Sequence, residues 1–235
     1  MKKTLVFLVL SGLLLFQTSN GVASYLYGIE VGDKIKFTSH TGPNGGGEFT
    51  WVADTDNNDI FGGDDYTWKS FCIEKNENIS LSDPPYEVKG ISGYAMAGGN
   101  GGQDALINGT NADSLSNETA WLFWNFSMGT LGTDSYAYTS TNAQEGYLQN
   151  IIWYLEGEID FSTLDQTNKN FYNAWNSDYL ASGWTNQGQV QVVNLGIGIQ
   201  DQLIVGTPVP EPGTMFLLGF GLIGIAGIGR KKLKK

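Results

Sequence analysis

The chain has 235 residues, of which 41% are hydrophobic and 13% aromatic, and its formal net charge is −11. This composition excludes a disordered chain, and the length suits one domain with targeting segments at its ends. The acidic balance argues against nucleic acid as a partner, because its phosphates repel carboxylates. The single cysteine excludes an intramolecular disulfide.

The first 24 residues have the pattern of a secretory signal peptide. A basic start at Lys2 and Lys3 precedes an apolar stretch over residues 5–16, and small residues around Ala23 favour cleavage before Ser24. We therefore expect export by the Sec machinery and processing by signal peptidase. An uncleaved N-terminal anchor is the alternative.

The body that follows, residues 25–207, is more acidic than the whole chain. Six lysines and 23 acidic residues lie between Ser24 and Val209, which gives a formal net charge of about −17. Such a surface disfavours anionic polysaccharide unless a divalent cation bridges the two, and it attracts amines and metal ions.

The first part of the body predicts strands. Apolar and polar residues alternate over residues 34–38, 48–53, 66–74 and 86–93, and turn residues separate these stretches. The Gly- and Asn-rich residues 97–111 predict a loop.

One stretch between these strands resembles the start of a calcium loop. Asp54, Asp56 and Asn58 place oxygen ligands at alternate positions. However, Asp59 stands where an EF-hand needs glycine, and Asp65 stands where it needs glutamate, so the stretch is not an EF-hand. A looser calcium site and a polar hairpin turn remain the alternatives, and no other cofactor is expected.

The middle of the body predicts three helices. The first is capped by Ser116 or Asn117 and ends near Met128. The second covers about residues 143–156, where Leu148, Ile151, Ile152 and Leu155 form an apolar stripe. The third covers about residues 164–180 and ends at Gly183.

Strands return over residues 190–195 and 203–205. An order of strands, helices and strands predicts a mixed α+β domain, in which a β-rich sheet or sandwich carries an insertion of about three helices.

The last 28 residues, 208–235, contain three signals in a fixed order. Pro210, Glu211 and Pro212 come first, an uncharged run follows over residues 214–229, and five of the last six residues are basic. A helix of 16 residues covers about 24 Å, which spans a bilayer core of roughly 30 Å only with local thinning or snorkelling. The basic end should remain cytoplasmic. A plain C-terminal membrane anchor is the alternative to a processed tail.

This tail resembles the PEP-CTERM sorting signal of Gram-negative envelope proteins. The resemblance implies that an exosortase recognises the chain and cleaves near Pro210, Glu211 and Pro212. It also implies transient residence in the inner membrane, then the cell envelope, cell surface or extracellular matrix, and association with exopolysaccharide or biofilm.

Two short motifs in the body bear on its activity. Cys72 lies between Phe71 and Ile73 late in an expected strand, and Gln149 lies beside the apolar stripe of the second helix, one turn before Trp153. This combination resembles the thioester domains of bacterial surface adhesins. The resemblance implies that Cys72 is the thiol and Gln149 the acyl donor of an internal thioester, which reacts with an amine or hydroxyl of a surface ligand.

The alternative for these two residues is structural. A lone cysteine between apolar neighbours is commonly a buried small hydrophobe, and a lone glutamine at a helix edge is commonly solvated. Two functions remain open for a body expected not to be an enzyme. One is a covalent adhesin that acts through Cys72 and Gln149, and the other is a non-covalent module that binds carbohydrate or matrix.

Overall fold

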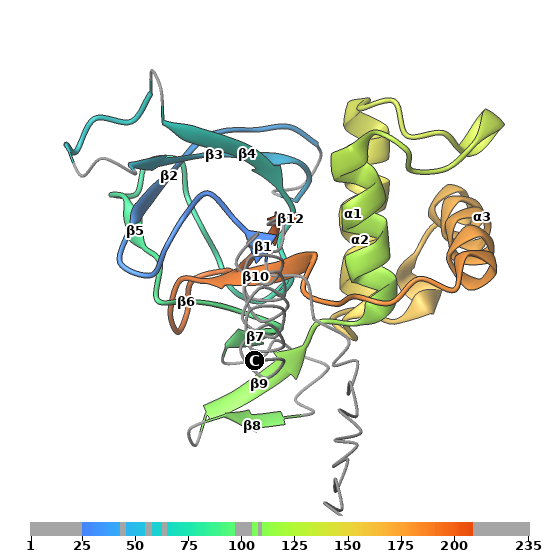
Figure 1. Ribbon diagram of the computed structural model, residues 1–235. Coiled ribbons are helices and arrows are strands. Elements are labelled where there is room, and N and C mark those ends of the chain that lie inside the picture. The colour runs from blue at the N-terminus through green and yellow to red at the C-terminus, as the bar shows by residue number, and fades with distance from the viewer. Residues whose placement is uncertain are drawn as a thin grey trace, which may run out of the picture.

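The computed structural model describes residues 25–42, 46–54, 58–62, 65–96, 105–107 and 110–208. Antiparallel strands form one half of this body, and three helices pack beside them (Figure 1). The helices follow one another between residues 117 and 182, with strands before and after them. The mixed α+β fold with a helical insertion is therefore confirmed.

The largest sheet supplies an aromatic core. Its strands, in spatial order, are β4 (Tyr66–Ser70), β3 (Phe49–Asp54), β2 (Lys34–His40) and β5 (Tyr86–Glu87). Trp51 of β3 is paired with Phe37 on one side and with Trp68 on the other. The rings of Trp51 and Trp68 stack with centroids 5.9 Å apart. Cross-strand aromatic pairs of this kind stabilise a sheet and fix its register.

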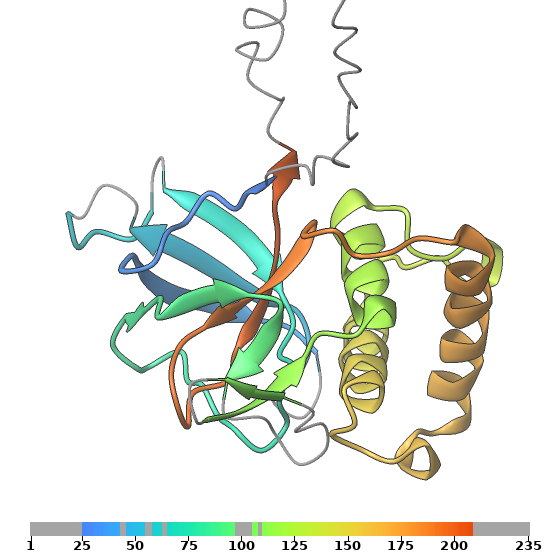
Figure 2. The same ribbon diagram turned by 60° about the horizontal axis from the view of Figure 1, so that its bottom comes forward.

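A second sheet forms the middle layer of the molecule (Figure 2). It contains β11 (Gln202–Val205), β10 (Val190–Asn194) and β6 (Gly90–Ser92). Successive side chains of a strand point to opposite faces. Accordingly, Val192 and Leu203 pack with the helices, whereas Val193 and Ile204 pack with the largest sheet. Two hydrophobic cores therefore lie on the two faces of this sheet.

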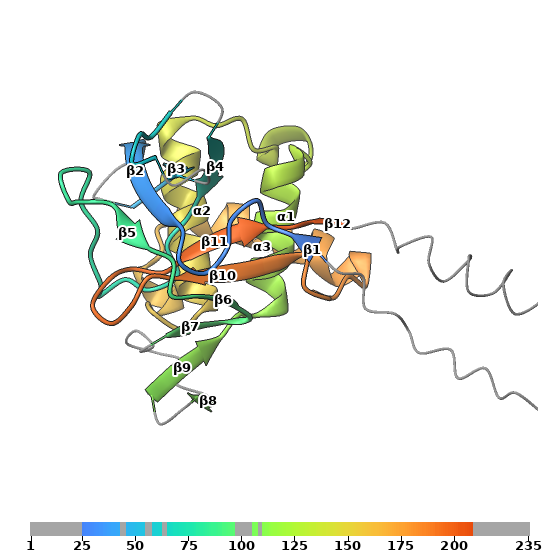
Figure 3. The same ribbon diagram turned by 60° about the vertical axis from the view of Figure 1, so that its left-hand side comes forward.

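Two smaller antiparallel sheets complete the β half. One contains β7 (Tyr94–Met96), β9 (Thr110–Ser114) and β8 (Ala105–Ile107), and the other pairs β1 (Tyr25–Leu26) with β12 (Thr207–Pro208). The β1–β12 pair brings the two ends of the described body side by side (Figure 3).

The helices begin and end where the sequence predicts. They are α1 (Asn117–Met128), α2 (Asn142–Leu155) and α3 (Gln166–Ser182), with 3-10 turns at Asp134–Tyr136 and Phe161–Thr163. The side chains of Ser116, Thr141 and Asp165 each accept a backbone N–H bond at a helix start. Gly183 ends α3 with a φ of 60°, a left-handed conformation that glycine adopts without strain.

Three expectations for the strands need correction. The strand expected over residues 66–74 ends at Ser70, and beyond it only Cys72 forms a β-bridge, because the chain passes there from β3 to β11. The strand expected over 86–93 is two strands, since β5 pairs with β2 and β6 with β10. The loop expected over 97–111 contains β8 and the start of β9, whose pairing gives its polar residues backbone partners.

No helix in the described ranges is long and apolar enough to cross a membrane. The run over residues 214–229, for which a membrane span is expected, lies outside those ranges.

Glu156 ties the end of α2 to the start of α1. Its side chain is only 4% exposed, and its Oε1 accepts a hydrogen bond of 2.7 Å from the Ser116 hydroxyl. Burial raises the pKa of Glu156 from 4.5 to about 7, although hydrogen bonds from Thr119 and Ser116 oppose the shift. The folded state therefore holds this proton more tightly than the unfolded state does.

We predict that the free energy of unfolding falls as the pH rises from 4.5 to about 7. The folded state binds more protons in that window, so raising the pH favours unfolding. Glu156→Gln removes this titration and should flatten the profile by on the order of 3 kcal/mol. Urea unfolding at a series of pH values measures this pH dependence of the free energy of unfolding, and the exposed Glu30→Gln is the control. A variant profile as steep as that of the wild type would contradict the assignment.

Candidate functional site

Cys72 lies where the two cores meet. Phe71 and Ile73 pack with the helices, while the Cys72 side chain points to the opposite core and is fully buried. On one side its strand faces β11, because Leu203 N–H donates to Phe71 O and Ile73 N–H donates to Asp201 O. On the other side the backbone N–H and C=O of Cys72 point toward α2.

Gln149 of α2 satisfies both of those backbone groups. Its Oε1 accepts a hydrogen bond of 3.0 Å from the Cys72 N–H, and its Nε2 donates one of 2.8 Å to the Cys72 carbonyl. The last ladder pair between β3 and β4 is Phe49 with Ser70, two residues before Cys72. Continued in this antiparallel register, the ladder would place residue 47 opposite Cys72, and the Gln149 carboxamide takes that place instead.

The thiol of Cys72 has a different partner. Gln202 of β11 directs its Nε2 to Cys72 Sγ at 3.1 Å, and its Oε1 accepts a bond of 3.3 Å from Trp51 Nε1. Burial raises the pKa of Cys72 well above its usual value, and the charge of Glu74 raises it further, whereas the bond from Gln202 lowers it. The sulfur is therefore a protonated thiol at neutral pH, held in an apolar environment.

Gly46, which lies just before β3, packs on the side chain of Gln149. Gly46 is buried, and a Cβ atom added there would lie 2.9 Å from Cγ of Gln149 and 2.8 Å from the ring of Trp153. Only glycine allows this close approach of the backbone. Gln149 and Trp153 are 1% and 8% exposed, so solvent water is kept from the carboxamide.

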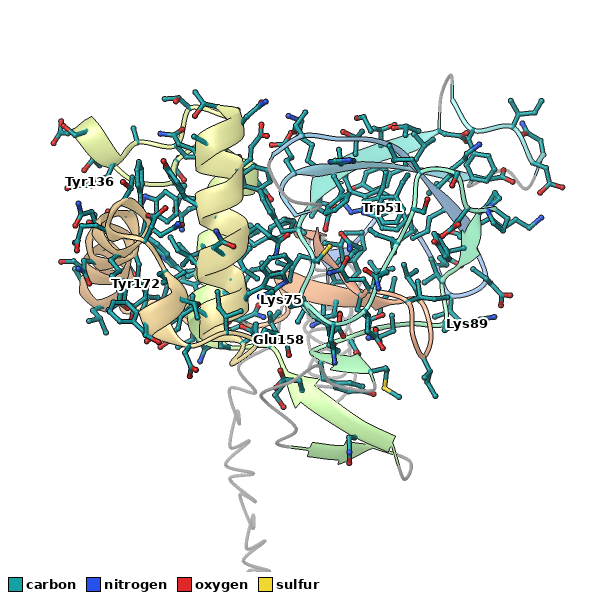
Figure 4. All side chains as sticks on the ribbon, turned by 180° about the vertical axis from the view of Figure 1, so that it is seen from behind. Trp51, Lys75, Lys89, Tyr136, Glu158 and Tyr172 are labelled. Carbon is teal, nitrogen blue, oxygen red and sulfur yellow. The ribbon has the colours of Figure 1, made fainter. Side chains whose placement is uncertain are left out.

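The segment after Cys72 is fixed at the boundary between the two halves of the molecule. Lys75 N–H donates a bond of 2.9 Å to Glu158 Oε2, and the two residues lie together at this boundary (Figure 4). The Lys75 ammonium lies 5.9 Å from the ring centroid of Trp153. These contacts fix the chain at Lys75, just after Cys72, against the helical half of the molecule.

The structure thus brings Cys72 and Gln149 together across 77 residues of sequence. The contact runs through the Cys72 backbone, whereas the sulfur is bonded to Gln202. The alternative of a solvated Gln149 is wrong, because this side chain is among the most buried in the described body.

The calcium candidate is only partly described, since Asp56 lies outside the described ranges. The Asp54 carboxylate is buried and accepts backbone N–H bonds from Asn58 and Asp59 at 3.0 and 2.8 Å. No group of three or more His, Cys, Asp or Glu side chains within the described ranges is placed to hold a metal ion.

The sorting triplet and the signal peptide also lie outside the described ranges. Residues 208–231 match the family model described as the PEP-CTERM protein-sorting motif. The chain is an exosortase substrate. Proteins with this motif are exported and sorted to the cell surface, so the localisation expected from the tail is confirmed to that extent. No curated protein and no solved structure matches the chain.

Sequence reasoning missed two parts of the site. Gln202 had no visible signal, because its bond to Cys72 joins residues 130 positions apart. Gly46 belongs to a run of three glycines that indicates a turn, but nothing in the run indicates that Gly46 packs on Gln149.

We predict that Gly46→Ala lowers the free energy of unfolding by about 1–3 kcal/mol, because the added methyl group overpacks Gln149 and Trp153. Gly93→Ala is the matched control, since a Cβ there has no atom within 4 Å. Urea denaturation of both variants measures the difference. If Gly46→Ala and Gly93→Ala have the same free energy of unfolding, Gly46 does not pack tightly on Gln149.

Proposed function

We propose that this exosortase-sorted protein is a covalent adhesin, in which Cys72 and Gln149 form an internal thioester. The observation that carries the proposal is the buried carboxamide of Gln149, bonded to both backbone polar groups of Cys72. The acyl carbon is therefore fixed beside the residue that bears the thiol. A rotation about the Cα–Cβ bond of Cys72 is the movement that brings Sγ to this carbon.

Formation of the bond needs no cofactor. The Cys72 sulfur attacks Gln149 Cδ, the C–N bond breaks, and the thiol proton leaves with the nitrogen as ammonia. Holding the two groups in one geometry replaces a slow encounter by a reaction within the fold, which lowers the entropic barrier. In this step the sulfur gives up its hydrogen bond from Gln202.

The surroundings suit a stored thioester. Hydrolysis needs water at the acyl carbon, and Gly46 and Trp153 exclude it. A partner that displaces Gly46 exposes the acyl carbon to its own amine or hydroxyl.

Reaction with the partner ends in a stable bond. The nucleophile forms a bond to Gln149 Cδ, the C–S bond breaks, and a proton from the nucleophile returns to the Cys72 sulfur. Each molecule reacts once, so the protein is not an enzyme. Surface amines and hydroxyls are the ligand class, including the hydroxyls of an exopolysaccharide.

We predict that the exported protein is lighter by one ammonia than the mass calculated for its processed chain, because thioester formation expels ammonia. One methylamine should then add per molecule, which leaves the protein heavier than that calculated mass by one methylene group and releases one thiol that titrates. Intact-mass spectrometry after methylamine treatment measures both steps. Cys72→Ala and Gln149→Ala should abolish them, whereas Gln166→Ala on the exposed surface of α3 should not.

An unmodified mass together with a freely titratable thiol would remove the proposal. Incorporation of more than one methylamine per molecule would contradict the single-use reaction.

A further inference from the structure

A cleft of about 650 Å³ opens on the side of β4 that faces α1. Its size is that of small-molecule sites in other proteins. The residues that line it are Glu48, Thr50, Tyr66, Thr67, Trp68, Lys69, Phe123, Phe126, Ser127, Met128, Gly129, Tyr138, Ser140, Val205 and Thr207. Neither Cys72 nor Gln149 lines this cleft, so the cleft is separate from the candidate thioester site.

The arrangement of the two larger sheets creates the cleft. β4 and β11 are edge strands of their sheets, and they meet at the bridge between Cys72 and Gln202. The Ser70 hydroxyl donates a bond of 2.6 Å to the Leu203 carbonyl beside that bridge. Tyr66 of β4, Val205 of β11 and Met128 at the end of α1 also line the cleft. Strands and a helix therefore supply much of its lining.

Aromatic rings supply its apolar surface. Tyr66 and Trp68 of β4 stack with centroids 5.5 Å apart and planes 22° apart. Phe126 and Tyr138 meet edge to face across from them, with centroids 5.3 Å apart. Trp51 also stacks with Trp68 at 5.9 Å, and Gly28 packs against the ring of Tyr66, so the faces of these two rings are occupied within the protein and they add apolar lining only.

The polar groups of the cleft require both a donor and an acceptor from a ligand. Within the described ranges, Trp68 Nε1 and Glu48 Oε2 have no hydrogen-bond partner, although these residues are only 8% and 5% exposed. A buried polar atom without a partner costs free energy that a ligand can recover. Hydroxyl groups both donate and accept. Threonine and serine hydroxyls also line the cleft.

Charge decides between classes of carbohydrate. Among the described residues that line the cleft, the lysine is Lys69, and its ammonium pairs with Glu48 at 2.5 Å. A body with a formal net charge of about −17 repels a polyanion. We propose that this cleft binds a neutral carbohydrate non-covalently, independently of the thioester.

Native gel electrophoresis through soluble polysaccharides tests the proposal with the exported protein. We expect at least one of laminarin, dextran and galactomannan to retard the wild type and Cys72→Ala equally, and alginate to retard neither. Tyr66→Ala should raise the dissociation constant by about tenfold, because it removes part of the cleft lining. Trp68→Phe keeps the ring and removes the donor, and it should have a similar effect.

Two controls separate a cleft effect from a loss of stability. Tyr86→Ala removes an aromatic residue from β5 at the opposite edge of the same sheet, and Lys89→Ala breaks the exposed ion pair with Glu87. Both should leave the dissociation constant unchanged. Failure of all three neutral polysaccharides to retard the protein, retardation by alginate alone, or equal weakening by the controls would overturn the proposal.

Discussion

The position of Cys72 depends on a change of strand partners. β4 leaves β3 after Ser70 and meets β11 at Cys72, so one edge of the chain lacks a strand neighbour there. A buried backbone N–H and C=O without partners would each cost free energy. The Gln149 carboxamide supplies both partners, because an amide has the same donor and acceptor as a peptide group. This one side chain therefore joins the helical half to both sheets.

The same requirement positions the chemistry. A carboxamide that must satisfy the Cys72 backbone is held beside the residue that bears the thiol, although the thiol itself points to the opposite core. Gly46 packs on the side chain of Gln149, and Gln202 donates a hydrogen bond to the sulfur of Cys72. In the proposed adhesin these contacts would exclude water from the acyl carbon and keep the two groups close together. In the structure they join the helical half of the body to the sheets.

The sequence predicts much of this arrangement and misses the rest for identifiable reasons. The helix caps and the stripe on α2 are local patterns, so Ser116, Gly183 and the helical position of Gln149 were predicted. The burial of Gln149 and the bond from Gln202 depend on contacts between residues far apart in the chain, which periodicity cannot reveal. The strands β7 and β8 have only three residues each, and β9 is almost entirely polar, so alternation does not indicate them.

A crystal structure of the exported protein tests the central claim most directly. The account predicts continuous electron density between Cys72 Sγ and Gln149 Cδ, with no Nε2 atom on residue 149. A free thiol bonded to Gln202, opposite an intact carboxamide in freshly purified and unreacted protein, would contradict it.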